Sequence, residues 1–373
     1  MKILIITNNF YPETSGGAHV QWGLARRLAK RHDVTVITSK DTGTAKFEKE
    51  ADVTIVRPLP SEYHTPVFDS LLNILGLAIF SLSALLYSIL RLPITDFDIV
   101  YTPTEDSHWI GHIFSYFEHV THVSFVGYSP CLKPDAGTVE SFIEKMNFRF
   151  FLSERALCQT NQVKEQIERF GSEGQILCGV LETDTLETIA RESISSDMRR
   201  QLDITQDDIL FASVGRITEN KNVVEAVQIF SNLPEEYHLI IVGDGPERKA
   251  VEEAIEDSGI GNRVHVVGKK PHKETLRTMR ESDGLILTSK AESSPLVILE
   301  SLALGSYVVA TPVGILPDIE HSNLILSEPE DMGSAIKTIE YTNPCSIDWS
   351  IIDEYSVDRF AEDVEGIFYA EAR

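Results

Sequence analysis

The chain has 373 residues, of which 42% are hydrophobic and 24% charged, a globular composition without low-complexity tracts. This length is sufficient for two ordinary domains. The formal net charge of -24 argues against nucleic acid, or a strongly anionic membrane surface, as the main partner.

The first residues, MKILII, contain an apolar run that is too short for a signal peptide and that predicts a strand. The four cysteines form no CxxC pair, which is typical of proteins from a reduced compartment. We therefore expect a cytoplasmic protein, which could also be peripheral on the inner face of the membrane.

Short apolar runs, mostly rich in β-branched residues, alternate with helical patterns along the chain. The first series of predicted strands lies at residues 2–7, 34–38, 53–56, 99–102, 123–126 and 157–160, and the helices between them include residues 18–31 and 139–155. The second series lies at residues 209–214, 238–242, 264–267, 284–288, 307–310 and 324–326. This alternation favours buried parallel strands covered by helices, so the predicted fold class is α/β with two doubly wound, Rossmann-like domains.

The two series are separated by residues 182–207, which are polar, charged and poor in aromatic side chains. We interpret this segment as the connection between the domains. In doubly wound domains the ligand-binding groups lie on loops that follow the strands. Two such domains facing each other would form a cleft, which is a common location for a binding site.

An uncharged segment at residues 70–90 lies within the first series and reads SLLNILGLAIFSLSALLYSIL. As a helix it would be about 30 Å long, which is enough to span a bilayer. A span would place the strands before and after it on opposite sides of the membrane, where one sheet could not contain both. We favour a helix buried against the first sheet. The alternatives are a helix that also contacts the membrane surface through residues 70–92, which would point to a lipid acceptor, and a true span.

A pair of glycines, Gly16 and Gly17, follows the first predicted strand and opens a helix. Paired glycines let a substrate approach the backbone and expose the helix N-terminus, although a glycine turn between a strand and a helix is also common for structural reasons. His19 follows in the same helix start. It could serve an acceptor hydroxyl, or it could be an ordinary surface or capping histidine.

Two cations flank a polar turn after the strand predicted at residues 209–214, where the sequence is GRITENKN from Gly215. Arg216 and Lys221 suit a diphosphate, because arginine offers a planar fork of donors and lysine a point charge. The alternative is a pair of solvated charges on a loop.

Three further patterns give weaker signals. The sequence GDGPERKA at residues 243–250 begins like a dinucleotide fingerprint but lacks the third glycine, so a structural turn is favoured over a nicotinamide cofactor. The sequence GKKP that starts at Gly268 could border a nucleotide base or simply carry exposed lysines. His108 and His112 have a spacing that metal sites use, but no HExxH motif or acidic ligand accompanies them, and we expect no metal.

Two carboxylates, Glu292 and Glu300, are separated by the seven residues SSPLVIL. The segment follows a predicted buried strand and opens a helix, with Pro295 suited to the first turn. The loop and the helix N-terminus can offer backbone N–H groups to an anion such as phosphate. A hydroxyl-rich ligand that carries phosphate would suit this site, which points to a nucleotide sugar.

These segments, in this order, resemble the retaining glycosyltransferases of family 4, the glycosyl transferases of group 1, whose GT-B fold consists of two facing Rossmann-like domains. The resemblance covers nearly the whole chain and also includes VGILPD at residues 313–318. It implies an acceptor-side domain at residues 1–182, a donor domain at residues 183–355, and a C-terminal helix at residues 356–373 that crosses back to the first domain.

The resemblance also implies roles for individual residues. Arg216 and Lys221 would bind the donor diphosphate, Glu292 the donor sugar hydroxyls and Glu300 the ribose hydroxyls, so that Arg216, Lys221 and Glu292 form the catalytic set. The full donor-binding set is Gly16, Gly17, Gly215, Arg216, Lys221, Gly268, Ser294, Leu296, Val297 and Glu300, and the acceptor side holds His19 and Tyr128. No metal or cofactor is implied beyond the nucleoside diphosphate sugar itself.

The chain departs from the family pattern at the carboxyl end of the strand at residues 123–126, where SFVGYS lacks the histidine that many members carry. The main hypothesis is retaining, metal-independent transfer of a hexose or N-acetylhexosamine to a glycan or lipid-linked acceptor. The missing histidine motivates one alternative, a catalytically weak nucleotide-sugar-binding subunit that supports a partner enzyme. A second alternative is a nucleotide-sugar 2-epimerase of the same architecture.

Overall fold

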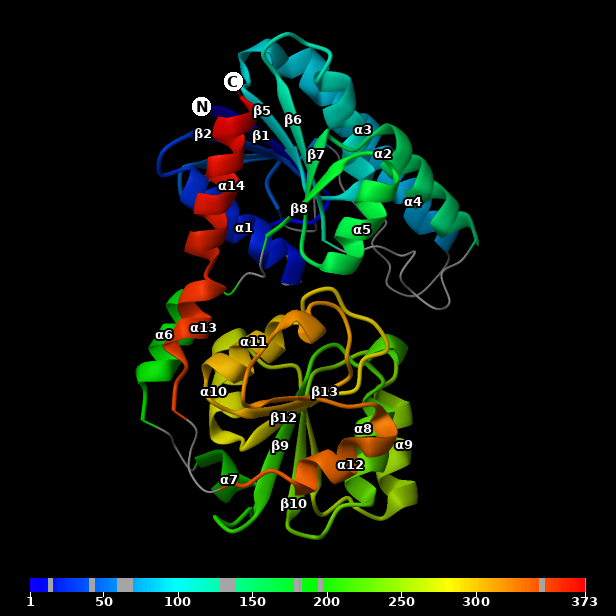
Figure 1. The fold of residues 1–373 in the computed structure, drawn as a ribbon, viewed down its shortest axis with the longest axis vertical. Coiled ribbons are helices and arrows are strands. Elements are labelled where there is room, and N and C mark those ends of the chain that lie inside the picture. The colour runs from blue at the N-terminus through cyan, green and yellow to red at the C-terminus, as the bar shows by residue number, and fades with distance from the viewer. Residues whose placement is uncertain are drawn as a thin grey trace. The chain divides into compact units, whose positions relative to one another are not determined.

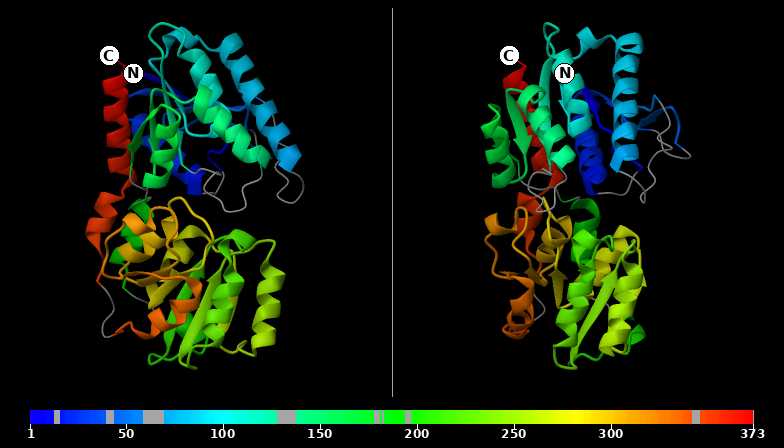
Figure 2. Two further views of the ribbon diagram at one scale, coloured as in Figure 1. Left: turned by 45° about the vertical axis from the view of Figure 1, so that its right-hand side comes forward. Right: turned by 90° about the vertical axis from the view of Figure 1, so that its right-hand side faces the viewer.

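The computed structural model describes residues 1–12, 16–39, 44–58, 70–127, 138–177, 181, 183–193, 197–341 and 346–372. These residues form two compact units, one of Met1–Val180 with Val357–Arg373 and one of Leu181–Ser356. Each unit is a sheet covered by helices (Figures 1 and 2).

In the described part of the first unit, eight strands form one sheet in the order β3-β4-β2-β1-β5-β6-β7-β8. They are β1 (Lys2–Ile6), β2 (Asp33–Ile37), β3 (Phe47–Glu50), β4 (Val53–Val56), β5 (Ile99–Thr102), β6 (Thr121–Val126), β7 (Arg155–Cys158) and β8 (Glu173–Ile176). Neighbours are parallel except for the antiparallel pair β3–β4. The sequence did not predict the edge strands β3 and β8, because FEKE and EGQI contain no apolar run.

The helices of the first unit are α1 (Gly16–Leu28), α2 (Ser70–Arg91), α3 (Glu105–Phe114), α4 (Thr138–Phe150), α5 (Asn161–Arg169) and α14 (Val357–Glu371). The predicted helix at residues 139–155 is too long, since α4 ends at Phe150 and β7 already begins at Arg155.

Helix α2 packs on the sheet of the first unit, as the favoured interpretation of its sequence predicts. Phe80 and Ala84 are buried in one cluster with Leu4 and Ile6 of β1. The opposite side of the helix is apolar and exposed, at Leu82, Leu86, Ile89 and Leu90. Among the described residues, no helix is both long enough and apolar enough to cross a membrane. Contact with a membrane surface stays a prediction.

The C-terminal helix α14 belongs to the first unit, which confirms its predicted return to that domain. It runs beside α1, and the two chain ends lie near each other (Figure 1). Asp358 accepts a hydrogen bond from the guanidinium of Arg27 at 2.8 Å, and Glu365 lies 2.6 Å from Nε2 of His32. The helix is therefore held beside α1 by the ion pair of Arg27 with Asp358 as well as by its apolar face.

In the described part of the second unit, six strands form a wholly parallel sheet in the order β11-β10-β9-β12-β13-β14. They are β9 (Ile209–Val214), β10 (Tyr237–Val242), β11 (Val264–Gly268), β12 (Gly284–Leu287), β13 (Tyr307–Ala310) and β14 (Leu324–Leu326), close to the second predicted series. The chain leaves β9 toward β10 on one side, and β12 later pairs with the other side of β9. The order of the strands thus switches between β9 and β12, where ligands of doubly wound sheets bind outside the carboxyl ends.

The helices of the second unit are α6 (Thr183–Arg191), α7 (Asp197–Gln201), α8 (Val223–Ser231), α9 (Arg248–Ser258), α10 (His272–Glu281), α11 (Leu296–Ala303), α12 (Pro329–Lys337) and α13 (Trp349–Glu354). Helices α6 and α7 lie within residues 182–207, the segment interpreted as the connection between the domains, and both belong to the second unit. The segment is polar on average, but the spacing of Leu186, Ile189 and Ala190 gives α6 a buried apolar face.

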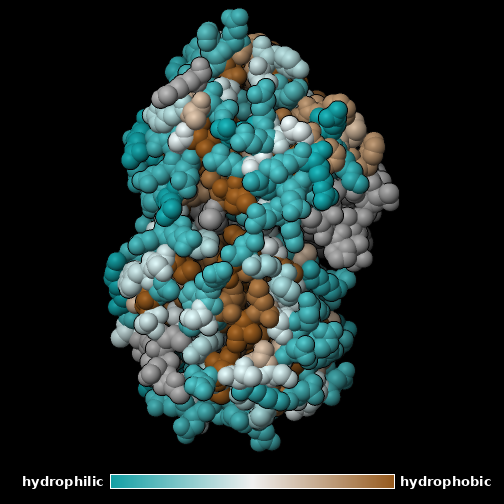
Figure 3. Space-filling view, in the orientation of Figure 1, coloured by the Kyte–Doolittle hydropathy of each residue, from teal (hydrophilic) through white to brown (hydrophobic). Residues whose placement is uncertain are grey.

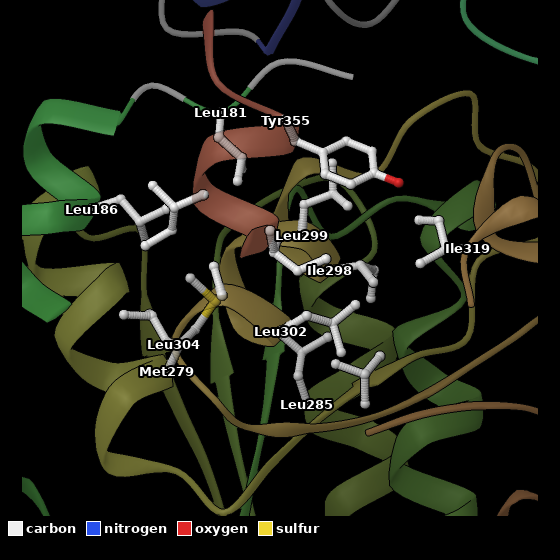
Figure 4. Close-up of a cluster of buried hydrophobic side chains, with 14 of the residues drawn as sticks. Leu181, Leu186, Met279, Leu285, Ile298, Leu299, Leu302, Leu304, Ile319 and Tyr355 are labelled. Atoms are coloured by element: carbon white, nitrogen blue, oxygen red, sulfur yellow. The ribbon is translucent and has the colours of Figure 1, made fainter. Parts of the chain in front are cut away.

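The core beside α11 joins elements that are distant in the sequence. Ile298, Leu299 and Leu302 of α11 lie beside Leu285 of β12, with Leu186 of α6 in the same cluster (Figure 4). Helix α11 starts at the predicted anion-binding loop. Its own buried side chains therefore anchor the helix, and with it the end of that loop, in the core.

Candidate active site

The loops after β9, β10 and β11 lie side by side at the carboxyl edge of the second sheet. The amide of Gly215 donates to the carbonyl of Val242 at 3.0 Å, and the amide of Gly243 donates to the carbonyl of Gly268 at 3.0 Å. Gly243 has φ +158°, and a Cβ atom there would collide with the carbonyl oxygen of Gly215. Only glycine allows this approach. The turn that starts at Gly243 therefore positions its neighbour, Gly215.

Lys221 and Glu292 meet at the point where the strand order switches. Nζ of Lys221 lies 2.6 Å from Oε1 of Glu292, and both side chains are largely buried. Lys221 ends the 3₁₀ turn after β9, and Asn222 follows with the left-handed φ of 49°. The two residues are distant in the sequence, so their pairing depends on the neighbouring positions of β9 and β12.

Hydrogen bonds tie the loop after β9 to the segment after β12. The hydroxyl of Thr288 donates to the carbonyl of Asn222 at 2.9 Å and to that of Lys221 at 3.2 Å. The amide of Lys290 donates to the carbonyl of Asn220, and the side chain of Asn220 donates to the carbonyl of Ala291, both at 2.8 Å. These bonds fix the backbone on both sides of the ion pair.

The same loops line a small pocket. Its lining residues are Ser213, Val214, Gly215, Arg216, Lys221, Val223, Ile241, Leu287 and Thr288. Three predicted site residues, Gly215, Arg216 and Lys221, are thus brought together, and the side chain of Arg216 is exposed. Sequence reasoning missed Thr288, whose only signal is its place at the end of a buried strand.

The loop before α11 is held from outside by the VGILPD segment. The amide of Ile315 donates to the carbonyl of Ser293 at 2.8 Å. Gly314 has φ +61°, and a Cβ atom there would collide with the same carbonyl oxygen. Among the described residues, the buried hydroxyl of Ser294 has no hydrogen-bond partner.

Helix α11 starts directly after Pro295, so the amides of Leu296 and Val297 belong to its first turn. Amides at that position have no partner within the helix and carry a partial positive charge. With the cations Arg216 and Lys221 in the same unit, this end of the sheet can bind an anion.

The second carboxylate, Glu300, is buried in α11 and has a partner that sequence reasoning missed. Nε2 of His272 lies 2.7 Å from Oε1 of Glu300. His272 opens α10, just beyond the GKKP loop that starts at Gly268. The sequence did hold one signal for His272. This residue opens a helix directly after the loop that could border a nucleotide base.

The predicted residues of the first unit lie at the start of α1, where Gly16, Gly17 and His19 are all exposed. Tyr128 lies outside the described residues. Sequence reasoning missed Arg57, a fully buried arginine whose Nη2 donates to the carbonyl of Tyr11 at 2.8 Å. Arg57 therefore fixes the backbone shortly before the glycine pair.

Of the two spaced histidines, His108 takes part in packing. His108 is buried between the side chain of Asn147 and the carbonyl of Phe125, each 3.2 Å from one of its ring nitrogens. Burial lowers its pKa to about 4, so the ring is neutral. No group of three or more His, Cys, Asp or Glu side chains among the described residues is placed to hold a metal ion.

The chain is similar in sequence and in fold to known glycosyltransferases. The family model of the glycosyl transferases group 1 matches residues 195–342. One subunit of the phosphatidylinositol N-acetylglucosaminyltransferase of Homo sapiens is 28% identical over 178 residues, which cover 47% of this chain and 37% of that protein. Over such aligned segments the chain spans 32–39% of the length of four curated relatives, all of them named as glycosyltransferases or synthases.

Solved structures share the fold over the whole chain. Sucrose-phosphate synthase from Thermosynechococcus elongatus has a TM-score of 0.74 at 18% identity, covering 100% of this chain and 96% of that one. HepE from Anabaena, in complex with UDP, has a TM-score of 0.74 at 17% identity, covering 99% of this chain and 100% of that one. With two α/β units and these structural matches, the chain has the GT-B fold, and its residues 195–342 match the glycosyl transferases of group 1.

Proposed function

We propose that the chain transfers a hexose or an N-acetylhexosamine from a nucleoside diphosphate sugar to a glycan or a lipid-linked acceptor, with retention and without a metal ion. The observation that carries this proposal is the ion pair of Lys221 with Glu292 at the switch point of the second sheet. In this pair, a cation that could bind phosphate is hydrogen-bonded to a carboxylate that could bind sugar hydroxyls.

Two relatives support the choice of donor. Structures of HepE hold UDP and UDP-glucose, and the human relative is named as an N-acetylglucosaminyltransferase. A uridine nucleotide is therefore the first donor to test. Arg216 and Lys221 would bind its diphosphate, and the amides of Leu296 and Val297 would face the same anion.

The reaction needs stabilisation of the leaving group above all. The bond between C1 of the sugar and the phosphate oxygen breaks, and its electron pair leaves with the diphosphate. Arg216, Lys221 and the start of α11 would stabilise that developing negative charge. The acceptor oxygen bonds to C1 on the same face, and its proton passes to the departing phosphate oxygen. Glu292 would hold the sugar hydroxyls and need not attack C1.

Lys221 can serve both partners in this scheme. Its ammonium carries three protons, so it can keep Glu292 through one of them and donate others to the diphosphate. The ion pair would then orient the lysine before the donor arrives, which lowers the cost of ordering it.

A lipid-linked acceptor is the version of the proposal that the first unit favours. Leu82 and Leu90 of α2 are 54% and 73% exposed. Figure 3 shows an apolar area on the part of the first unit where α3 and α4 lie in Figure 1. Flotation of the full chain with liposomes tests this version, and failure to float would remove it.

Diphosphate release from a panel of UDP-, GDP- and ADP-sugars, with and without membrane extract, tests the proposal. We expect release that requires an acceptor and that disappears in Arg216→Ala and Glu292→Ala. Lys249→Ala is the matched control, because Lys249 is an exposed cation of α9 that pairs only with its helix neighbour Glu253 among the contacts of the described residues.

Two other outcomes would assign a different function. Tight donor binding without release, with or without acceptor, would favour a nucleotide-sugar-binding subunit, and relatives named as subunits make this the second candidate. A changed donor sugar without diphosphate release would indicate an epimerase.

A further inference from the structure

A histidine and a carboxylate from two different helices meet beside the proposed donor site. His272 opens α10, whereas Glu300 lies in α11, and Nε2 of His272 is 2.7 Å from Oε1 of Glu300. An ionised carboxylate can only accept hydrogen bonds. Nε2 must therefore carry the proton, and His272 donates to Glu300.

The two side chains differ in their exposure to solvent. The side chain of Glu300 is only 10% exposed, whereas that of His272 is 41% exposed. A largely buried carboxylate needs hydrogen-bond donors to offset its lost hydration. His272 supplies one from the solvent side, and this hydrogen bond restrains Oε1 of Glu300.

The pair is also connected to the pocket through the backbone. His272 follows the loop that starts at Gly268, and the carbonyl of Gly268 accepts from the amide of Gly243, which abuts Gly215. The donor loop and the His272–Glu300 pair thus belong to one edge of the sheet. Each carboxylate oxygen has two lone pairs, so the carboxylate of Glu300 keeps acceptor sites for ligand hydroxyls when Oε1 is bound to His272.

We propose that His272 is a positioning residue that holds Glu300 so that its carboxylate accepts from the adjacent hydroxyls of a nucleotide ribose. The proposal rests on the proposed function, in which Glu300 binds those hydroxyls. It adds a specific consequence: the preference of the chain for a ribonucleotide over its 2′,3′-dideoxy analogue depends on His272. The alternative to positioning is competition, in which His272 occupies the place of the ribose hydroxyls at Glu300 and weakens nucleotide binding.

Calorimetric titration of the full chain distinguishes these relations. The probes are UDP, GDP and ADP, and then the 2′,3′-dideoxy analogue of whichever binds most tightly. We expect the wild type to prefer the ribonucleotide by about tenfold or more, which is the scale of a lost hydrogen bond to a charged group. His272→Ala should lose most of that preference through weaker ribonucleotide binding, with binding of the dideoxy analogue unchanged.

Three variants separate positioning from a general structural role. His272→Gln keeps a side-chain N–H donor and should restore much of the preference. In a Glu300→Gln background, His272→Ala should have no further effect on it. Lys273→Ala is the matched control, because Lys273 is the next residue of α10 but pairs with Glu192, which directly follows α6, and it should leave both affinities unchanged.

Each remaining outcome has one meaning. An unchanged preference in His272→Ala overturns the positioning role, and tighter ribonucleotide binding in that variant shows competition and overturns it as well. A wild type that binds nucleoside diphosphates without preferring the ribonucleotide overturns this inference but leaves the proposed transfer intact. A wild type that binds none of the three nucleotides overturns the proposed function itself.

Discussion

Lys221 and Glu292 are both largely buried, so each depends on the other for compensation of its charge. Removing one member of such a pair leaves the other charge unpaired in a largely buried site. The resulting loss of stability is larger than the stability that the intact pair contributes. The two residues are nevertheless expected to do different things. Under the proposed function Lys221 would face the diphosphate, and Glu292 would face the sugar.

Replacement of Glu292 by glutamine should separate these roles. Glutamine keeps the size of the side chain but leaves Lys221 free for phosphate, so affinity for the nucleoside diphosphate alone should change little. Transfer should fall by about 10²- to 10³-fold, the usual effect of removing one group that acts in the transition state. Lys221→Met should instead weaken nucleoside diphosphate binding. Titration calorimetry and diphosphate release measure the two effects, and equal losses of binding in both variants would contradict the division of roles.

A second set of carboxyl groups lies in the first unit, at the start of α3. Burial, together with the nearby carboxyls of Glu144 and Asp106, raises the pKa of Glu105 to about 8. Burial likewise raises the pKa of Asp106 to about 6. The folded state thus binds protons that the unfolded chain releases at neutral pH.

This gives the free energy of unfolding a definite dependence on pH. The pKa of Glu105 is higher in the folded state than in the unfolded chain. Its protonated carboxyl therefore contributes to the free energy of unfolding fully below the ordinary carboxyl range, and this contribution is lost as pH rises toward 8. Glu105→Gln should therefore gain stability relative to wild type between pH 5 and pH 8, by as much as about 4 kcal/mol. Urea unfolding of the first unit across this range measures it. Glu118→Gln, an exposed glutamate after α3, is the control, and parallel curves for Glu105→Gln and wild type would refute the assignment.

At the scale of elements, the candidate site depends on loops that are held by close backbone contacts. The VGILPD segment supports the loop before α11 through the carbonyl of Ser293, which accepts from Ile315 and excludes any side chain at Gly314. The start of α11 is therefore placed by a segment that does not itself line the pocket.

Two glycines with similar backbone angles test this support. Gly314 has φ +61° and meets the carbonyl of Ser293, whereas Gly259 has φ +66° and nothing within 4 Å of an added Cβ. Gly259→Ala should cost only the strain of a left-handed alanine, about 1–2 kcal/mol, and leave donor binding unchanged. Gly314→Ala must also move the loop, so it should be less stable and bind the nucleoside diphosphate more weakly. Thermal unfolding and calorimetry compare them, and equal effects would show that the contact is not important.

The strands show which parts of the fold are readable from the sequence. Apolar runs predicted most of both sheets, because a parallel strand covered on both faces must be apolar throughout. The edge strands β3 and β8 have polar sequences and pair through their backbones, so no pattern of side chains marks them. Helix α6 was missed because a few apolar residues at helical spacing were outweighed by the polar average of the segment.

The candidate site shows the same limit. Arg216, Lys221, Glu292 and Glu300 were singled out by their residue types and their places after strands. The pairing of Lys221 with Glu292 follows from the position of β12 beside β9, which the sequence does not state. His272 gained its interest only when α10 was seen to start beside Glu300.

At the scale of the whole molecule, the two units differ in how the chain builds them. The second unit is continuous, and among the described residues its apolar clusters are formed by members of the range from Leu181 to Tyr355. The first unit needs the end of the chain, since Phe360 and Phe368 of α14 make ring contacts with residues of β6 and β5. Folding of the first unit therefore requires segments from both ends of the sequence.

A fragment of residues 181–356 should therefore fold alone, with cooperative thermal unfolding. The fragment contains all the proposed nucleotide-binding side chains of the second unit, Arg216, Lys221, His272, Glu292 and Glu300. It should therefore bind a nucleoside diphosphate about as tightly as the full chain. It should transfer no sugar. A fragment of residues 1–180 should not fold, because without α14 it exposes the apolar surface that Phe360 and Phe368 cover. Circular dichroism and calorimetry on both fragments measure this. A folded second unit that binds no nucleotide would place an essential donor contact in the first unit, and a stable 1–180 fragment would show that α14 is dispensable for its core.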